Sequence, residues 1–375
     1  LKLDRKVGIL KLGTLWPFPS HLVVSHMKKA KRVLVVEEVD PYVETHAKAA
    51  LADARLPDAP EILGRGSGHI SYVGENTPDR VLAALASIFG LEYKARTPAY
   101  QAKVDALLGK MVVSRGLIWC PGCPHRASFY AIKNAIKRDG RNAVVTSDIG
   151  CYTMDAFPDG PQVTNVLHCM GGGLGEGCGF GQLQQFGFEQ PVISICGDST
   201  FFHASITPLV NALYNKSNMV AVILDNSITA MTGFQPHAGS GRTATQDPTA
   251  IVSAEDLCRT LGCRVEVVDA FDTRGVTSKL VELMKDDDGV KVLILRRKCE
   301  LLRMRQEKTY PYNVWVDVEK CKGDKCGFCY SILQCPGVSY DEETGKAKIQ
   351  PALCAYCGLC ADLCPHKAIV KEERA

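Results

Sequence analysis

The sequence has no long apolar run, no large excess of one charge sign and no cysteine before Cys120. No stretch approaches the roughly 20 apolar residues that a membrane-spanning helix requires, and no apolar segment follows the first residues as in a signal peptide. The 44 basic and 41 acidic residues leave a net charge of +3, which gives no case for a nucleic-acid partner. Because the chain does not begin with Met, we expect it to be a segment of a longer protein.

Cysteine is the residue that the sequence has in excess. There are seventeen, and eight of them fall between Cys321 and Cys364. A secreted protein held together by disulfides is normally shorter and has cysteines throughout. Dense short spacings without a secretion signal favour metal ligation instead, in a reducing and oxygen-poor cytoplasm.

Length and pattern predict three domains, at 1–96, 97–304 and 305–375. In the first two, β-branched apolar runs alternate with helical patterns, which predicts α/β domains with doubly wound parallel sheets. Residues 305–320 are expected to be a connector, and the cysteine-rich remainder is too short to fold well on apolar burial alone. The expected strands are 7–11, 33–37, 143–146, 192–196, 219–224, 264–268 and 290–295. The expected helices include 81–88 (capped by Thr77), 124–137 and 204–214.

The most specific pattern is a pair of four-cysteine runs, each followed by Pro. The second run has the spacing of bacterial ferredoxins, in which the fourth cysteine ligates the other cluster. The first run has longer spacings, which enlarge a loop without removing a ligand. Paired zinc sites are the less favoured alternative. The predicted ligands of two [4Fe-4S] clusters are Cys321, Cys326, Cys329 and Cys364 for one, and Cys354, Cys357, Cys360 and Cys335 for the other.

A second pattern lies at the ends of two neighbouring predicted strands. Gly197-Asp198-Ser199 ends one strand and Asp225-Asn226 ends the next. Parallel strands bring such residues to the carboxyl edge of the sheet, where ligands bind. Asp198 and Asn226 side chains with the Ile228 carbonyl would suit Mg²⁺ carrying phosphate oxygens. Two ordinary turns would have the same composition, and this alternative stays open.

These residues resemble the thiamine diphosphate motif of thiamine enzymes, with Ser199 and Asp225 as departures from its usual form. The departures are similar to variants in 2-oxoacid:ferredoxin oxidoreductases. Three further stretches support the resemblance: Trp119-Cys-Pro-Gly-Cys-Pro-His-Arg-Ala, Asp148-Ile-Gly-Cys-Tyr-Thr and His168-Cys-Met-Gly-Gly-Gly-Leu-Gly. With the two-cluster tail, the chain resembles the large subunits of indolepyruvate ferredoxin oxidoreductases. This implies a transketolase C-terminal-like domain, a thiamine diphosphate-binding domain and a small α+β ferredoxin domain.

The resemblance also implies a third, proximal [4Fe-4S] cluster. Its ligands would be Cys120, Cys123, Cys151 and Cys299, although Cys120 and Cys123 alone could form a redox-active pair. The five remaining cysteines are expected to be buried core thiols. They are Cys169, Cys178, Cys196, Cys258 and Cys263.

Further expectations concern the residues that would contact thiamine diphosphate. Backbone at Gly171, Gly172 and Gly173 would approach the cofactor, although a tight turn with close helix packing is the interpretation that the glycines alone favour. Thr232 and Gly233 would touch the diphosphate. His125 would face the thiazolium or the substrate, unless it is a capping or core histidine. Glu37-Glu38 matches a family motif, but a surface carboxylate pair is the default interpretation.

The reaction implied is oxidative decarboxylation of a 2-oxoacid, such as indolepyruvate or another aryl pyruvate, to its acyl-CoA. Electrons would pass through the clusters to an external ferredoxin. The carboxylate that activates the aminopyrimidine is missing, so a pyrimidine-binding domain must come from an upstream segment or another chain. A smaller partner subunit and coenzyme A are also implied. A non-oxidative thiamine decarboxylase, and an electron-transfer subunit with another 2-oxoacid or a vestigial thiamine site, remain alternatives.

Overall fold

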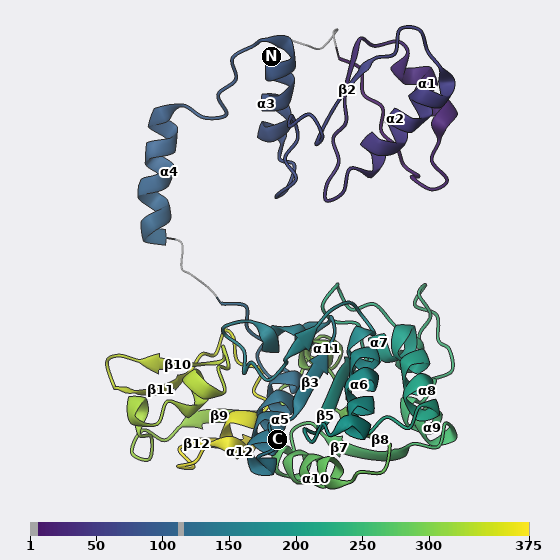
Figure 1. The fold of residues 1–375 in the computed structure, drawn as a ribbon. Helices are drawn as coiled ribbons and strands as arrows, with labels where there is room; N and C mark the ends of the chain where they lie inside the picture. The colour runs from purple at the N-terminus through teal and green to yellow at the C-terminus, as the bar shows by residue number, and fades with distance from the viewer. Residues whose placement is uncertain (1–6, 112–115, 375) are drawn as a thin grey trace. The chain divides into compact units, whose positions relative to one another are not determined.

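The computed structural model describes residues 7–111 and 116–374. The chain divides into two compact units, Leu1–Ser114 and Arg115–Ala375 (Figure 1), and each is described by itself. None of the helices in the described ranges combines the length and apolar character that crossing a bilayer requires.

The first unit is a small α/β arrangement. Its elements are α1 (Ser20–Met27), β1 (Arg32–Leu34), α2 (Tyr42–Ala54), β2 (Glu61–Leu63), α3 (Pro78–Phe89) and α4 (Pro98–Met111). The strands β1 and β2 pair in parallel, so within the described residues the expected doubly wound sheet is reduced to one two-stranded ladder. Its core joins α1 to α2 through Val23, Met27, Ala47 and Leu51.

Two local predictions in this unit have opposite outcomes. The strand expected at 7–11 is wrong, because these residues join no ladder and Ile9 is 87% exposed. The helix cap at Thr77 is confirmed, since its side chain accepts a hydrogen bond from the Arg80 N–H at the start of α3. The Glu37 carboxylate accepts from the Val43 and Glu44 N–H groups and so caps α2, which is a structural role.

The second unit is built on one parallel six-stranded sheet in the order β4-β3-β5-β6-β8-β7. The strands are β3 (Val144–Ser147), β4 (Val166–Leu167), β5 (Val192–Gly197), β6 (Met219–Asp225), β7 (Arg264–Asp269) and β8 (Val290–Arg296). All five strands predicted for this domain are confirmed, and β4 is an addition. Strands of a parallel sheet are covered on both faces, which explains why β5, β6 and β8 are mostly apolar.

Helices cover both faces of this sheet, as the doubly wound prediction requires. One core lies under α5 (Pro124–Asp139) and α10 (Thr273–Lys285). The other lies under α6 (Gly172–Gln182), α8 (Ile206–Tyr214) and α9 (Ala254–Thr260). Alternate residues of each strand enter the two cores, as in Val220 and Val222 against Ala221 and Ile223. Short α7 (Asp198–Thr200) follows β5, and α11 (Glu300–Glu307) follows β8.

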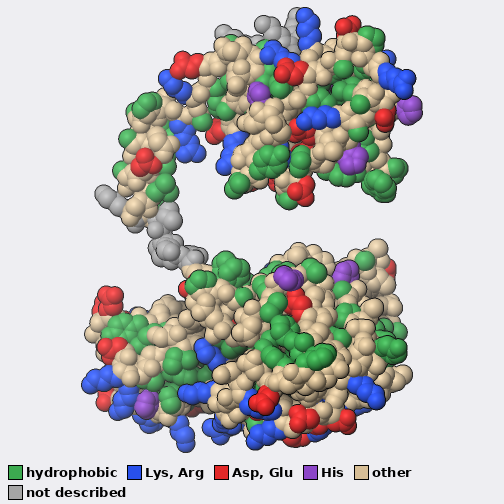
Figure 2. Space-filling view, in the orientation of Figure 1, with side chains coloured by type: hydrophobic (Ala, Val, Ile, Leu, Met, Phe, Trp, Pro, Cys, Tyr) green, Lys and Arg blue, Asp and Glu red, His purple; other side chains and the backbone are tan. Residues whose placement is uncertain are grey.

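The cysteine-rich tail folds against α5 in this unit. It contains β9 (Tyr312–Val316), the hairpin β10 (Val338–Asp341) and β11 (Lys346–Ile349), α12 (Leu359–Leu363) and β12 (Ile369–Glu373). The connector expected at 305–320 is wrong in part, because β9 lies within it and pairs antiparallel with β12. Buried Ala127 of α5 joins the core of the tail. Figure 2 shows Lys and Arg side chains, with some acidic ones, over this part of the unit.

Candidate functional site

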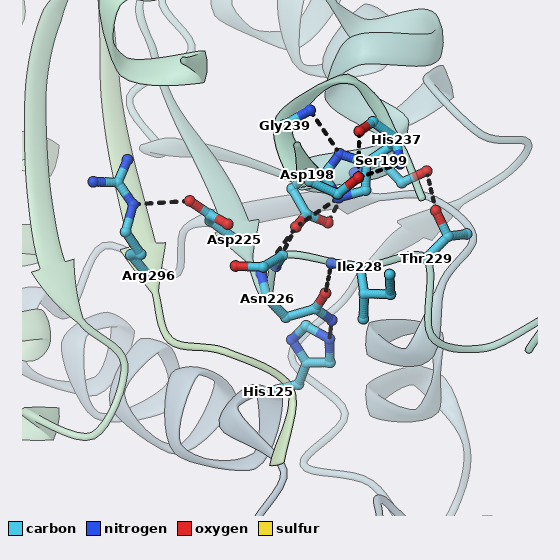
Figure 3. Close-up of polar contacts among 12 residues, drawn as sticks. His125, Asp198, Ser199, Asp225, Asn226, Ile228, Thr229, His237, Gly239 and Arg296 are labelled. Carbon is cyan, nitrogen blue, oxygen red and sulfur yellow. Dashed lines mark hydrogen bonds and ion pairs between the residues drawn. The ribbon is translucent and has the colours of Figure 1, made fainter. Parts of the chain in front are cut away.

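The carboxyl edge of the sheet brings the two predicted side-chain ligands of Mg²⁺ together. Strands β5 and β6 are parallel neighbours, with Gly197 opposite Leu224. Beyond them, Asp198 Oδ2 accepts hydrogen bonds from the Asn226 N–H (3.1 Å) and the Ser227 N–H (2.6 Å) (Figure 3). Asp198 is 4% exposed and Asn226 is 7% exposed. A carboxylate and an amide oxygen, carried at the ends of neighbouring strands, are oxygen donors of the kind that a hard divalent cation takes.

The Asn226 amide is held in one orientation. Its Oδ1 accepts from the Ile228 N–H (3.1 Å), and its Nδ2 donates to His125 Nε2 (3.2 Å). Burial lowers the pKa of His125 to about 4, against the opposing effect of Asp198. The ring is therefore neutral and can accept this bond at Nε2. The structure thus places His125 on Asn226, and whether it also faces a bound substrate stays a prediction.

Asp225 points away from this pair. Its carboxylate accepts a hydrogen bond from Arg296 Nε (2.8 Å), and Arg296 also contacts Glu255 (3.1 Å). This explains how the site tolerates Asp at a position where the thiamine motif usually has Asn: the side chain belongs to an ion pair at the sheet edge. Ser199 accepts from the Thr229 hydroxyl (2.7 Å), which ties the start of α7 to the loop after β6.

Sequence reasoning missed His237. Its Nε2 lies 3.2 Å from Asp198 Oδ2, and its Nδ1 accepts from the Gly239 N–H (3.1 Å). The ring stacks on Phe202 at 5.7 Å between centroids. No short sequence motif indicates such a residue, because His237 lies in the long loop after β6 and reaches Asp198 only when that loop folds back.

Two other predicted contacts lie elsewhere. Thr232 and Gly233 belong to a turn closed by pairing of Thr229 with Gln235, and the Thr232 hydroxyl donates to the Gln235 side chain (2.6 Å). Within residues 116–374, neither hydrogen-bonds to Asp198 or Asn226. Their proposed contact with the diphosphate stays a prediction.

The glycine run packs α6 closely onto the sheet. A Cβ on Gly173 would lie 2.8 Å from the Ser147 backbone, and one on Gly171 would lie 2.6 Å from Ala204 Cβ. The Gly171 N–H donates to Asp148 Oδ2 (3.0 Å), while Gly172 faces His168 and Cys169. Packing therefore accounts for Gly171 and Gly173, and an additional contact of all three with a cofactor stays a prediction.

Asp148 is a buried group whose role the sequence did not reveal. Its carboxylate accepts hydrogen bonds from the Tyr152 hydroxyl and the Gly171 N–H. Burial raises the pKa of Asp148 to about 6. The Tyr152 hydroxyl also lies 3.2 Å from Thr200 Oγ1, so this network connects β3, α6 and α7 beneath the edge.

The first cysteine group is assembled from three separate segments. Cys120 and Cys123 form the turn before α5, Cys151 begins a short helix after β3, and Cys299 caps α11. Trp119 Nε1 donates to the Cys151 carbonyl (2.8 Å), which joins two of these segments. Burial raises the pKa of Cys151 to about 11, and the nearby Cys299 and Cys120 thiols contribute to this increase.

Gly122 is the point where this turn meets both flanking segments. Its φ is +69°, which favours glycine. A Cβ there would lie 2.7 Å from Glu300 Cγ and 3.1 Å from Ala355 Cβ. The turn is thus wedged between the residue after Cys299 and the residue after Cys354.

The eight tail cysteines line two separate cavities, in the two sets expected from the sequence. One cavity is lined by Cys335, Cys354, Cys357 and Cys360. The other is lined by Cys321, Cys326, Cys329 and Cys364. Backbone N–H groups face the sulfurs, including Tyr356 N–H to Cys354 (3.3 Å) and Ala368 N–H to Cys364 (3.2 Å).

Burial disfavours ionisation of some of these thiols. Burial raises the pKa of Cys329 to about 12 and that of Cys357 to about 12, and only thiolates bind metal. Among the described residues, no three His, Cys, Asp or Glu side chains are grouped tightly enough for a single metal ion. A cubane is larger than one ion, so its ligands stand further apart than those of a single metal ion.

Comparison with known proteins finds matches for two parts of the chain. The family model "Thiamine pyrophosphate enzyme, C-terminal TPP binding domain" matches residues 148–294, and "4Fe-4S binding domain" matches residues 347–370. Three relatives carry the name indolepyruvate oxidoreductase subunit IorA. The one from Archaeoglobus fulgidus is 36% identical over 98% of this chain and 56% of its own length. The one from Pyrococcus horikoshii is 36% identical over 97% of this chain and 56% of its own length. The one from Methanothermobacter thermautotrophicus is 35% identical over 99% of this chain and 57% of its own length.

This chain is related to the IorA-type large subunits. The resemblance inferred from the sequence is therefore confirmed, and so is the combination of a thiamine diphosphate-binding domain with a 4Fe-4S domain. The chain spans little more than half the length of the curated relatives it matches.

The remaining cysteines of the chain do not all behave as expected. Cys178, Cys196, Cys258 and Cys263 are buried, as predicted, whereas Cys169 is exposed and its prediction is wrong. Cys169 lies in the turn before α6, where neither core of the sheet reaches it.

Proposed function

We propose that this IorA-type chain binds the diphosphate of thiamine diphosphate and carries electrons in a 2-oxoacid:ferredoxin oxidoreductase. Asp198, Asn226 and the Ile228 carbonyl would hold Mg²⁺ with the diphosphate. When bound, thiamine diphosphate supplies the carbanion stabilisation that lets a 2-oxoacid lose CO₂. The substrate we propose is indolepyruvate or a related aryl pyruvate, after the names of the relatives, and the product is the acyl-CoA.

One observation carries the proposal: the candidate cofactor edge contacts the first cysteine group, and that group contacts the first tail cavity. The Cys299 N–H donates to the Asn226 carbonyl (2.9 Å), so the first cysteine group begins at the diphosphate edge. Gly122 in that group contacts Ala355 beside the first tail cavity. Three [4Fe-4S] clusters in these groups would lead electrons from the cofactor toward the second tail cavity and an external ferredoxin.

The residues of this chain have defined tasks in such a reaction. Asp198 and Asn226 bind and orient, with His125 and Ile228 fixing the Asn226 amide. His237 contacts the Asp198 carboxylate and would help to hold it in place. The carboxylate that activates the aminopyrimidine would come from a pyrimidine-binding domain in an upstream segment or another chain, and a smaller subunit would complete the site.

The experiment is an anaerobic assay of the chain with its partner subunit. We expect indolepyruvate, coenzyme A and ferredoxin to be consumed together, with about twelve iron and twelve sulfide per chain if three cubanes are present. The isolated chain with thiamine diphosphate and Mg²⁺ should show little turnover. CO₂ release without ferredoxin reduction would indicate a non-oxidative decarboxylase, and zinc without sulfide would refute the clusters.

A further inference from the structure

Arg126 is a buried cation in an unfavourable place. It lies in the first turn of α5 and is 3% exposed. The amino end of a helix carries partial positive charge, which disfavours a cation. Among the described residues, no Asp or Glu side chain forms an ion pair with it, and its Nε has no hydrogen-bond partner. A buried charge without a counter-charge is costly, so the site must supply one in another form.

The hydrogen bonds of Arg126 span two parts of the fold. Its guanidinium donates to the Leu333 and Gln334 carbonyls of the tail, both at 2.6 Å. It also donates to the Trp119 carbonyl, next to Cys120. These acceptors are neutral, so they orient the guanidinium without balancing its charge.

The groups that can balance it are cysteine sulfurs on both sides. Arg126 lines the tail cavity that holds Cys335, Cys354, Cys357 and Cys360. Its own turn carries Cys120 and Cys123 of the first cysteine group. Burial lowers the pKa of Arg126, against the opposing effects of Cys335, Cys123, Cys120 and Cys357. Arg126 stands between the two candidate clusters, because it lines the cavity of one and donates to backbone carbonyls beside Cys120 of the other.

We propose that Arg126 is the counter-ion shared by the cluster of the first cysteine group and the cluster of the adjoining tail cavity. A cubane held by four thiolates is net negative, and reduction adds one more negative charge, so a fixed cation favours the reduced state. In the transfer, one electron leaves the first cluster, which is oxidised, and enters the second, which is reduced. Arg126 stays protonated, and no bond forms or breaks. This inference rests on the proposed function.

The test compares Arg126→Gln and Arg126→Lys in the full chain with its partner subunit, purified anaerobically. Arg138→Gln is the matched control, because Arg138 is exposed in the last turn of the same helix. Iron and sulfide analysis establishes the cluster content. EPR-monitored redox titration then gives the midpoint potentials.

We expect Arg126→Gln to disfavour reduction of both clusters by about tenfold, which is about 59 mV for one electron. Arg126→Lys keeps the charge and should stay near the wild-type potentials, as should Arg138→Gln. The proposal is wrong if Arg126→Gln and Arg126→Lys shift the midpoint potentials equally, or if Arg126→Gln shifts the potential of neither cluster. In either case Arg126 only positions the tail. If Arg126→Gln loses iron, retention by Arg126→Lys supports a charge requirement, and loss in both variants overturns it.

Failure of the proposed function would look different. Wild-type protein with about eight iron per chain would lack the first cluster and would overturn both proposals before any variant is compared. A full iron content with unchanged potentials in Arg126→Gln overturns this inference alone.

Discussion

The Cys299 N–H donates a hydrogen bond to the Asn226 carbonyl at 2.9 Å. Strands β6 and β8 are parallel neighbours with Asp225 opposite Arg296, so the chain leaves both strands at the same edge. A candidate Mg²⁺ ligand and a candidate cluster ligand are thereby held in one backbone unit. Rigid strands position a site more accurately than loops do, and here they fix the start of the proposed electron path.

The first prediction concerns the charge of Asp198. Asp198→Asn in the assembled oxidoreductase should weaken Mg²⁺-dependent binding of thiamine diphosphate on the order of 100-fold, because it removes the anionic ligand. Asp225→Asn is the control, since Asp225 lies at the same edge but pairs with Arg296. Isothermal titration calorimetry measures both. Equal losses in the two variants, or none in Asp198→Asn, would contradict the assignment.

The second prediction concerns the first cysteine group. Cys299→Ser should reduce the iron content by about four per chain, because a [4Fe-4S] cluster needs all of its thiolates. Cys169→Ser is the control, because Cys169 is exposed and belongs to none of the three sets. Iron analysis of anaerobically purified protein distinguishes them. An unchanged iron content in Cys299→Ser would return Cys120 and Cys123 to the alternative of a redox pair.

Sequence patterns predicted those features that depend on strand order and short spacing. Asp198 and Asn226 follow consecutive strands, and strands that are consecutive in an open α/β sheet are commonly neighbours. The two sets of tail cysteines follow from ferredoxin spacing alone, and they line separate cavities.

The contacts that sequence could not predict are those made by returning loops and by packing. His237 reaches Asp198 from a loop whose path has no periodic signal. Arg126 looks like an ordinary helix residue until the tail folds over it and supplies the Leu333 carbonyl. The strand expected at 7–11 has the right composition but no partner strand in the described ranges, and tertiary context overrides β-propensity in such cases.

The third prediction separates packing from cofactor contact in the glycine run. Gly173→Ala should destabilise the chain by about 1–3 kcal/mol, because its Cβ would meet the Ser147 backbone at 2.8 Å. Gly175→Ala, in the same helix, meets nothing within 4 Å and should stabilise it by about 0.5–1 kcal/mol. Thermal unfolding under reducing conditions measures both. Equal effects at the two positions would show that contact with the sheet does not constrain α6.

The fourth prediction is a pH dependence from Lys291. This side chain is 1% exposed, and its Nζ donates to the Asn218 amide oxygen and to the Asp286 carbonyl (2.6 Å). Burial lowers the pKa of Lys291 from 10.5 to about 8, against the opposing effect of Asp286. Between these values the unfolded chain binds the proton more tightly than the folded chain does. Folding stability from this group therefore rises with pH between about 8 and 10.5, by about 3 kcal/mol in total.

Lys291→Met tests this dependence. The variant loses two hydrogen bonds, so it should be less stable than wild type at every pH in the window. The free energy of unfolding of the variant should nevertheless lack the increase with pH that Lys291 contributes. The difference in free energy of unfolding between wild type and variant should therefore widen from pH 8 to 10. Lys285→Met, at the exposed end of α10, should track wild type throughout. Urea unfolding under anaerobic reducing conditions gives the free energies, and a gap that stays constant with pH would mean that Lys291 titrates normally in the folded chain.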